Sequence, residues 1–368
     1  MKKNLIVLTT GGTGGHIFPA EAVASYLVKQ KDYKLAFITD KRIQKRISGT
    51  LATLPVYYIC ASSITGRGFF GKVKAAFKLA YGTLQAVRVL IKLRPRLVVG
   101  FGGYASVPAV LAAQFLHIPV ALHEQNAVLG RANRLLARRT CLIATTFTPT
   151  KQIPQGAKTI QTGMPVRPQI IAKANTPYPT DTEEFRLFIM GGSQGARAFS
   201  DILPKALVAL SPELKAKLVL TQQVRAEDMD RVQEEYRNSG IKSINLSPFF
   251  DNVPEILSDA HLVISRSGAS SLAEFSMLGR PALLIPLPTA ADDHQTANAR
   301  IWTADGAGWL MVEKETTPEV ITERLTSLME NPTVLTNAAQ CALNTNPKIS
   351  ADKALADAIT DILKEKAK

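Results

Sequence analysis

The sequence predicts an α/β protein made of two similar halves, each built around a parallel sheet. Two glycine-rich turns, at residues 11–16 and 191–197, each follow a short apolar strand and each open a helical pattern. Strands and helices alternate through both halves, which predicts parallel sheets with both faces covered by helices. A chain of 368 residues also exceeds one ordinary hydrophobic core, so two domains are expected.

The expected strands are short apolar runs between helical patterns. In the first half they span residues 4–8, 34–38, 56–59, 97–99, 120–122 and 142–145. In the second half they span residues 186–190, 217–221, 244–247, 262–265 and 282–286. Because ligands bind beyond the carboxyl ends of parallel strands, both glycine-rich turns lie where a ligand is expected.

A proline-bearing segment around residues 163–168 separates the halves. We therefore expect a first Rossmann-like domain over residues 1–165 and a second over residues 166–346. Residues 350–366 show a helical pattern with one apolar face, which needs a partner. We expect residues 347–368 to pack back on the first domain.

Residues 97–123 carry no Asp, Glu, Lys or Arg and are long enough to raise the question of a membrane span. Three glycines and two prolines interrupt them, which favours a buried strand, a loop, a short helix and a second buried strand. The apolar run at residues 5–8 is too short for a signal peptide, so no export signal is expected.

Charge is concentrated in the first half, where residues 1–180 contain 25 Lys and Arg but four acidic residues. Such a half attracts nucleic acid, acidic lipid or pyrophosphate. No nucleic-acid-binding signature accompanies it, so a nucleic-acid partner is not expected. Cys60, Cys141 and Cys341 are widely spaced, which argues against a disulfide framework or a zinc knuckle and suits a reducing compartment.

A helical pattern over residues 72–94 predicts one buried apolar stripe. The stripe consists of Val73, Phe77, Ala80, Leu84, Val87 and Ile91. Just before it, adjacent aromatics lie between cations, and two interpretations are open. Either Phe69 and Phe70 cap the core under a loop, or they enter a bilayer interface while cations meet anionic headgroups. The cations of the second interpretation are Arg67, Lys72, Lys74 and Lys78.

The first glycine-rich turn directs backbone N–H groups and a helix start at one space, an arrangement that binds phosphate. It matches neither the dinucleotide fingerprint nor the P-loop. It places His16 at the helix start, where the dipole favours the neutral imidazole. A neutral histidine beside a substrate can act as a general base, whereas the simpler interpretation is a histidine that caps the turn.

The second turn also satisfies the nucleophile-elbow pattern G-x-S-x-G, which supplies a serine hydrolase as an alternative. Its triad would need an acid and then a histidine from later in the chain: Asp251 or Asp259, and His261 or His294. That interpretation ignores the first half, where the matching turn has no serine. We therefore expect the hydroxyl of Ser193 to face a phosphate.

Residues 265–274 repeat the strand, small-residue turn and helix, and offer further N–H donors to phosphate. The carboxylate of Glu274 could bind vicinal sugar hydroxyls, as acidic residues bind ribose in other nucleotide folds. The simpler interpretation is that its charge complements the helix dipole. The acidic segment 292–294 has no second cluster with ligand spacing, so no metal is expected. Gln295 and Asn298 are better suited to binding hydroxyls.

Seven motifs, in order along most of the chain, together resemble the MurG family of bacterial glycosyltransferases. They are GGTGGH at 11, GFGGYAS at 100, HEQNAVLGRANR at 123, GMPVR at 163, GGSQGAR at 191, SRSGASSLAE at 265 and DDHQTANA at 292. The resemblance implies a GT-B fold, with two Rossmann-like doubly wound domains and a cleft between them. It implies inverting transfer of N-acetylglucosamine (GlcNAc) from UDP-GlcNAc to the 4-hydroxyl of N-acetylmuramic acid in lipid I. Lipid I is undecaprenyl-pyrophosphoryl-N-acetylmuramyl-pentapeptide, and the product is lipid II, for peptidoglycan synthesis.

The resemblance also implies a set of binding residues. In the second domain Phe250 lies near the uracil, Glu274 binds the ribose, and Gln295 and Asn298 lie near the sugar. The diphosphate is held by Ser193 and by the helix start of Ala269, Ser270, Ser271, Leu272 and Ala273. Further donor contacts come from Arg167 and, in the first domain, from Thr13, Gly14, Gly15 and Asn126. The acceptor pyrophosphate is expected near Gly102, Gly103 and Tyr104.

The implied chemistry is a single displacement. As a hypothesis, His16 accepts the proton of the muramyl 4-hydroxyl while that oxygen attacks the anomeric carbon, and Glu124 is the reserve candidate for the base. The helix starts and Arg266 stabilise departing UDP, so neither a metal nor another cofactor is expected. Four positions depart from the family pattern: Met164, Ala105, Val107 and His294. The change at Met164 puts local linker contacts in doubt, not the activity.

The expected partners are UDP-GlcNAc, lipid I and an anionic membrane surface, which Phe69, Phe70, Lys72 and Lys74 would meet. The resemblance leaves room for cell-wall synthesis or division proteins as further partners. The implied location is the cytoplasmic face of the inner membrane, as a peripheral protein. A UDP-sugar epimerase of related fold is the nearest enzymatic alternative.

Overall fold

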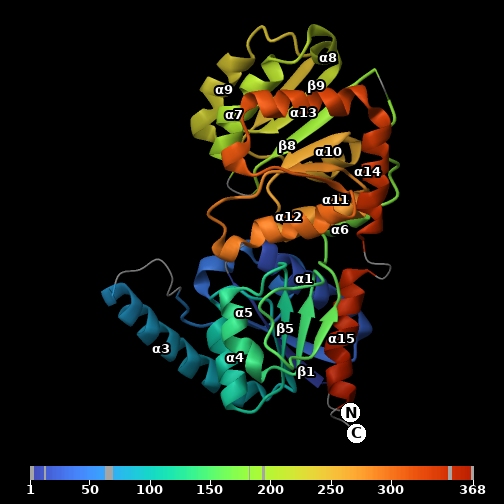
Figure 1. Cartoon of the computed structure of the whole chain (residues 1–368). Helices are drawn as coiled ribbons and strands as arrows, with labels where there is room; N and C mark the ends of the chain where they lie inside the picture. Colours follow the sequence, from blue (N-terminus) through green and yellow to red (C-terminus); the bar gives the residue numbers. More distant parts are fainter. Residues whose placement is uncertain are drawn as a thin grey trace. The chain divides into compact units, whose positions relative to one another are not determined.

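The computed structural model describes residues 4–11, 14–62, 69–181, 183–192, 195–346 and 350–365. The chain folds into two compact units, the first formed by Met1–Arg167 with Pro347–Lys368 and the second by Pro168–Asn346 (Figure 1). The division between Arg167 and Pro168 lies two residues beyond the boundary that the sequence predicts.

The first unit contains a parallel sheet in the order β3-β2-β1-β4-β5-β6-β7. Its strands are β1 (Asn4–Thr9), β2 (Tyr33–Thr39), β3 (Val56–Tyr58), β4 (Leu97–Gly100), β5 (Val120–Glu124), β6 (Leu142–Thr145) and β7 (Thr159–Gln161). The direction of strand order reverses between β1 and β4, and ligands bind beyond the strand ends at such a point in doubly wound sheets.

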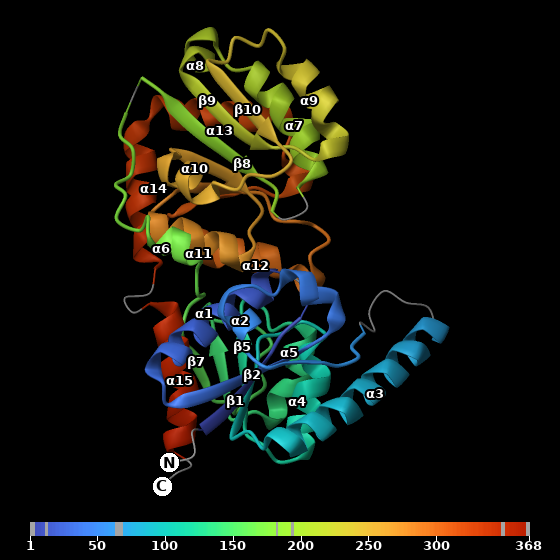
Figure 2. The same ribbon diagram turned by 180° about the vertical axis from the view of Figure 1, so that it is seen from behind.

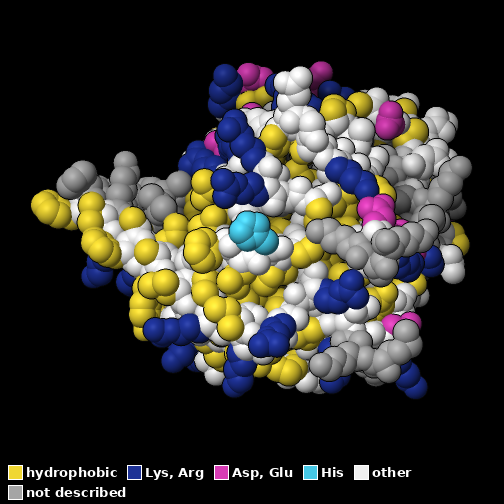
Figure 3. All heavy atoms as spheres, turned by 90° about the horizontal axis from the view of Figure 1, so that it is seen from below, with side chains coloured by type: hydrophobic (Ala, Val, Ile, Leu, Met, Phe, Trp, Pro, Cys, Tyr) yellow, Lys and Arg dark blue, Asp and Glu magenta, His cyan; other side chains and the backbone are white. Residues whose placement is uncertain are grey.

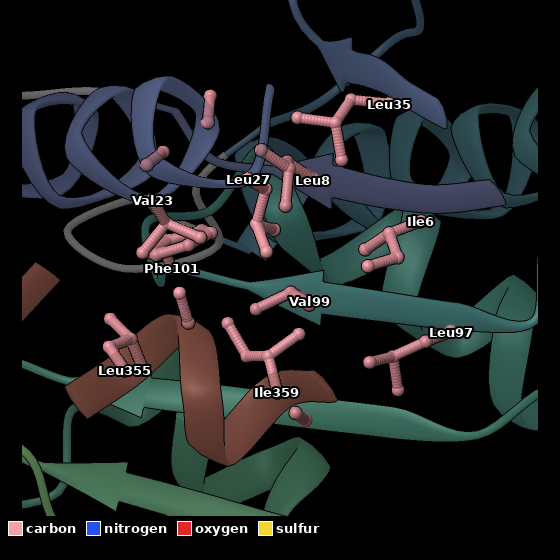
Figure 4. Packing of buried hydrophobic residues seen from close by; sticks show 14 of the residues in the cluster. Ile6, Leu8, Val23, Leu27, Leu35, Leu97, Val99, Phe101, Leu355 and Ile359 are labelled. Atoms are coloured by element: carbon pink, nitrogen blue, oxygen red, sulfur yellow. The ribbon is translucent and has the colours of Figure 1, made fainter. Parts of the chain in front are cut away.

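Helices cover both faces of this sheet. They are α1 (Gly14–Gln30), α2 (Gly49–Thr53), α3 (Phe69–Leu93), α4 (Ser106–Phe115), α5 (Arg131–Leu136) and α15 (Ala351–Glu365). Because side chains alternate along a strand, Ile6 and Leu8 of β1 pack on the α1 and α15 face, while Val7 packs on the α3 and α4 face. Leu355 and Ile359 of α15 lie among the strand residues of the first face (Figure 4).

The second unit contains a parallel sheet in the order β10-β9-β8-β11-β12-β13, in which the direction of strand order reverses between β8 and β11. Figure 2 shows β8, β9 and β10 of this sheet. Its strands are β8 (Phe185–Met190), β9 (Leu218–Gln223), β10 (Ser243–Ser247), β11 (Leu262–Ser265), β12 (Ala282–Leu284) and β13 (Gly308–Leu310). Its helices are α6 (Pro168–Ile171), α7 (Arg197–Val208), α8 (Pro212–Lys217), α9 (Met229–Tyr236), α10 (Val253–Asp259), α11 (Ala269–Leu278), α12 (His294–Ala304), α13 (Pro318–Glu330) and α14 (Pro332–Asn344).

A fully buried arginine ties three segments of this unit together. The guanidinium of Arg280 donates to backbone carbonyls in α10, at the end of α11 and in the segment after α6. The carbonyls belong to Leu257, Ser258, Leu278, Gly279, Thr176 and Pro177. Burial lowers the pKa of Arg280 to about 10, so the group remains cationic at neutral pH.

Every strand that the sequence predicts is present, and so is the strand, loop, helix and strand over residues 97–123. The two strands not predicted, β7 and β13, have three residues each and lie at sheet edges. Among the described residues, no helix is both long and apolar enough to cross a membrane.

The predicted buried stripe of α3 is wrong. Most of its members are exposed, Phe77 to 73%, and Val87 is half-buried. The helix instead packs through small residues, Ala75, Gly82 and Ala86, together with Leu90. A Cβ at Gly82 would lie 1.8 Å from the carbonyl oxygen of Cys60, so the missing side chain permits the close approach. Periodicity found the helix but selected the face with the larger apolar residues.

Candidate active site

The glycine-rich loops that follow β1 and β4 pack against each other at the carboxyl ends of these neighbouring strands. A Cβ at Gly11 would lie 2.2 Å from the Cβ of Ala105, and one at Gly103 would lie 2.3 Å from the carbonyl oxygen of Gly11. Gly102 and Gly103 also have φ of +82° and +75°. Both close contact and backbone conformation therefore require glycine, and the loops meet where a ligand is expected.

His16 lies in the first turn of α1 beside these loops and is half-buried. Its Nδ1 is 2.9 Å from Oε1 of Gln125, the residue that follows β5. A Cβ at Gly102 would lie 3.2 Å from the same Nδ1, which shows how closely the loop after β4 approaches the imidazole. The structure thus brings together residues from the ends of β1, β4 and β5.

Glu124, the reserve candidate for the base, is buried at the end of β5 and is engaged by four donors. One carboxylate oxygen accepts from the backbone N–H and the side-chain amide of Asn126, at 3.0 and 3.4 Å. The other accepts from the N–H of Gly130 at 2.9 Å and from Nδ2 of Asn133 at 2.8 Å. This geometry fits a carboxylate that holds the loop after β5. Asn133 is a partner that sequence reasoning missed.

His123 is completely buried in β5, next to the same loop. Burial lowers its pKa from 6.5 to about 4, against a smaller opposing effect of its hydrogen bond to the Gly163 carbonyl. The imidazole is therefore neutral at physiological pH.

In the second unit, the glycine-rich turn follows β8. Gly192 and Gly195 have φ of +86° and +69°, and a Cβ at Gly195 would lie 2.7 Å from Cγ of Arg225. A Cβ at Gly191 would meet the backbone N of Ala196 at 2.3 Å. The turn is thus compact. Ser193 lies outside the described residues, as does Thr13 of the first turn.

The loop after β11 leads into α11, whose first residues are the predicted diphosphate contacts. Ala269 and Leu272 are buried, while Ser270, Ser271 and Ala273 are half-buried. The amide of Leu272 already donates to the Gly268 carbonyl, so free donors are expected earlier in the first turn. Glu274 is buried in the second turn.

The predicted sugar-binding amides adjoin this loop. The buried Asn298 donates from Nδ2 to the carbonyl of Ser267 at 3.1 Å. Oε1 of Gln295 accepts from the backbone N–H of Leu287 at 3.0 Å. After β10, Phe250 lies edge-on to Phe188, with ring centroids 6.2 Å apart.

Arg266 is buried and well anchored. Its guanidinium forms an ion pair with Glu313 at 2.5 Å and donates to the carbonyls of Ile285 and Pro286. It also lies 4.8 Å from the ring centroid of Phe199. Its predicted part in stabilising UDP stays a prediction, and its visible contacts connect strand ends within the unit.

The remaining predicted residues are distributed as follows. Gly14 and Gly15 begin α1, Asn126 and half-buried Tyr104 follow β5 and β4, and Arg167 ends the first unit's main segment. His261 lies before β11 and accepts from the N–H of Arg186 at the start of β8, at the opposite end of this strand from Gly191 and Gly192. It is thus not a triad partner.

The described residues hold no group of three or more potential metal ligands.

Two family models match the chain, the glycosyltransferase family 28 N-terminal domain over residues 6–145 and its C-terminal domain over residues 186–358. A curated relative from Rhodospirillum rubrum is 51% identical over 92% of this chain and 87% of the relative. It is named UDP-N-acetylglucosamine--N-acetylmuramyl-(pentapeptide) pyrophosphoryl-undecaprenol N-acetylglucosamine transferase. A relative with the same name from Paramagnetospirillum magneticum is 46% identical over 98% of both chains.

Solved structures agree with this similarity. The crystal structure of Acinetobacter baumannii MurG has a TM-score of 0.79 and 30% identity, covering 97% of this chain and 99% of that one. A putative UDP-N-acetylglucosamine 2-epimerase from Listeria monocytogenes has a TM-score of 0.69 at 15% identity, which reflects the fold alone. The predicted GT-B fold is confirmed by the two parallel-sheet units and these neighbours.

Proposed function

The chain belongs to glycosyltransferase family 28, and from that premise we propose that it transfers GlcNAc from UDP-GlcNAc to lipid I, forming lipid II. The observation that carries the proposal is the 51% identity, over 92% of the chain, to a relative named for this transfer. The epimerase alternative is not retained, because the epimerase likeness is confined to the fold.

His16 is our candidate for the general base. The muramyl 4-hydroxyl oxygen attacks the anomeric carbon of GlcNAc, the bond from that carbon to the UDP oxygen breaks, and the hydroxyl proton passes to the imidazole. Its position in the first turn of α1, beside the loop of Gly102 and Gly103, supports this role. Glu124 is the weaker candidate because its carboxylate already accepts from four donors.

We also propose that departing UDP is stabilised by helix N-termini without a metal ion. The first turn of α11 follows the loop after β11, and the amides of its first three residues, before Leu272, lack intrahelical acceptors by geometry. Such preorganised donors stabilise a developing diphosphate charge. We expect transfer to be the same with and without EDTA, and a loss of transfer in EDTA that added magnesium restores would contradict this.

Single-turnover transfer of radiolabel from UDP-GlcNAc to a short-chain lipid I analogue tests the function and the base together. We expect wild-type transfer, and a loss of about 100-fold or more in His16→Ala. The exposed His117 of the same unit provides the matched control, because His117→Ala should transfer at the wild-type rate. Undiminished transfer by His16→Ala removes His16 from the base role. Isomerised sugar without any lipid acceptor would instead restore the epimerase.

The exposed face of α3 supports the proposal that the first unit binds an anionic membrane surface. Phe70 is 86% exposed, which argues against its capping a core, and Val73, Phe77, Tyr81, Leu84 and Ile91 continue the same face. Lys74, Lys78, Arg88 and Lys92 are exposed beside it. Figure 3 shows hydrophobic side chains along the projecting helix with Lys and Arg nearby. The side chains of Phe69 and Lys72, and all of Arg67, lie outside the described residues.

Apolar side chains beside cations are typical of surfaces that enter the boundary of an anionic leaflet. Phe115 of α4 and Leu135 of α5 are also strongly exposed in the same unit. We therefore propose a peripheral location on the cytoplasmic face of the inner membrane, where lipid I would be the acceptor.

Sedimentation with anionic phospholipid vesicles tests this surface. We expect Phe77→Ser to weaken binding about 10-fold or more, because burial of such a side chain contributes about 1.5–3 kcal/mol. Val73→Ser should weaken it several-fold, whereas Val320→Ser in the second unit is the matched control. The two valines are 40% and 41% exposed. Equal binding by both valine variants and Phe77→Ser would contradict the proposal.

A further inference from the structure

Gln125, which directly follows β5, connects His16 and His123 through the two ends of its side-chain amide. Its Oε1 is 2.9 Å from Nδ1 of His16. Its Nε2 donates to the carbonyl of Phe101 at 2.9 Å, and on the other side it lies 3.1 Å from Nδ1 and 3.3 Å from the carbonyl oxygen of His123. On the far side, Nε2 of His123 is 3.3 Å from the carbonyl of Gly163. Gln125 is buried, so this chain of groups is held inside the first unit.

Two backbone carbonyls fix the direction of every hydrogen bond in the chain, because a carbonyl oxygen only accepts. The Phe101 carbonyl requires the NH₂ end of Gln125, which turns Oε1 toward His16. The Gly163 carbonyl requires a proton on Nε2 of His123. Burial keeps that imidazole neutral, with a pKa near 4, so its Nδ1 carries a lone pair and accepts from Gln125.

We propose that Gln125 is a positioning residue that holds neutral His16 as the tautomer with its proton on Nδ1. An amide oxygen cannot donate, so the hydrogen bond at 2.9 Å requires the proton to be on the imidazole. Nε2 then carries the lone pair and is the nitrogen that accepts the proton of the acceptor hydroxyl. This inference rests on the proposed transfer for its catalytic consequence, whereas the tautomer itself is a property of the protein alone.

The tautomer is measurable without substrate. Wild-type protein with ring-¹⁵N-labelled histidine is examined by long-range ¹H–¹⁵N correlation at about pH 8, above the ordinary histidine pKa. His16→Gln identifies the His16 signals among those of the five histidines. We expect a protonated Nδ1 and an unprotonated Nε2. A protonated Nε2 in the wild-type protein overturns the proposal whether or not any variant folds.

Gln125→Met removes the amide at nearly constant size. We expect the His16 signals to shift toward the other tautomer and kcat for transfer to fall about 10- to 100-fold, the usual effect of losing an orienting partner. KM for UDP-GlcNAc should stay within about twofold. Gln114→Met is the matched control, because Gln114 also donates to two backbone carbonyls in this unit, those of Leu136 and Arg139, but does not contact His16.

The outcomes separate three cases. A fall in kcat with unchanged His16 signals, or the same fall in Gln114→Met, overturns the positioning role in favour of a general structural effect. A changed tautomer with unchanged kcat overturns its catalytic consequence. Absence of transfer by the wild-type protein counts against the proposed function, and the ¹⁵N measurement still decides what Gln125 does to His16.

Discussion

The buried His123 should make the stability of the first unit depend on pH. Unfolded histidine takes up a proton near pH 6.5, whereas in the folded unit burial delays protonation until about pH 4. The depressed pKa therefore contributes stability that is complete above pH 6.5 and is lost as pH falls toward 4. From these two pKa values, proton linkage predicts that the free energy of unfolding of the first unit falls by about 2 kcal/mol between about pH 6.5 and about pH 5.

The assay must report on the first unit alone. Both tryptophans, Trp302 and Trp309, lie in the second unit, so tryptophan fluorescence cannot follow this effect. Hydrogen exchange detected by mass spectrometry can, through peptides that contain the buried strands β4 and β5. The same peptides are compared between wild type and variants, after correction for the intrinsic pH dependence of exchange.

His123→Gln isolates the histidine from carboxylates that titrate in the same range. We expect the loss of protection between about pH 7 and pH 5 to be smaller in this variant than in wild type by about 2 kcal/mol. His117→Gln is the matched control, because that side chain is exposed and should leave the wild-type slope unchanged. Equal slopes for wild type and His123→Gln would refute the reasoning.

Three further predictions concern single side chains. Arg280→Met should lower the free energy of unfolding of the second unit by about 3 kcal/mol, because the buried carbonyls that accept from the guanidinium lose their donor. Urea unfolding followed by tryptophan fluorescence measures this, and Arg300→Met, at an exposed arginine, should have no measurable effect. Glu124→Gln should reduce the hydrogen-exchange protection of the first unit by about 2 kcal/mol, because the new amide NH₂ would face N–H donors such as those of Gly130 and Asn133. If this variant loses transfer but keeps full protection, Glu124 returns as the candidate base. Gly82→Ala should destabilise α3 although alanine has the higher helix propensity, because the added Cβ clashes with the Cys60 carbonyl. Hydrogen exchange of α3 peptides measures this, and increased protection would contradict the close approach.

Sequence patterns predicted the sheets well because parallel strands are buried on both faces and appear as continuous apolar runs. They failed on α3, where both faces carry apolar residues and the helix packs through small ones such as Ala75 and Gly82. Hydrophobicity measures which side chains prefer burial, whereas the docked face is set by how closely two backbones approach.

At the candidate site, motifs located His16 and Glu124, yet neither motif nor spacing revealed what they contact. Gln125 lies within a recognised motif, but its importance depends on an amide orientation that the backbone carbonyls of Phe101 and His123 impose. Asn133 reaches Glu124 from α5, nine residues further along the chain. Such hydrogen bonds depend on side-chain directions, which a linear pattern does not contain.

The placement of α15 has a consequence for synthesis. Its side chains, including Leu355 and Ile359, form part of the hydrophobic core beside β1 and β4, although the whole of the second unit precedes it in the sequence. A ribosome therefore delivers the second unit in full before the first unit receives the helix that completes its hydrophobic core. We expect a nascent chain stalled before residue 351 to recruit chaperones at that incomplete core, and release from them to follow translation of the terminal helix.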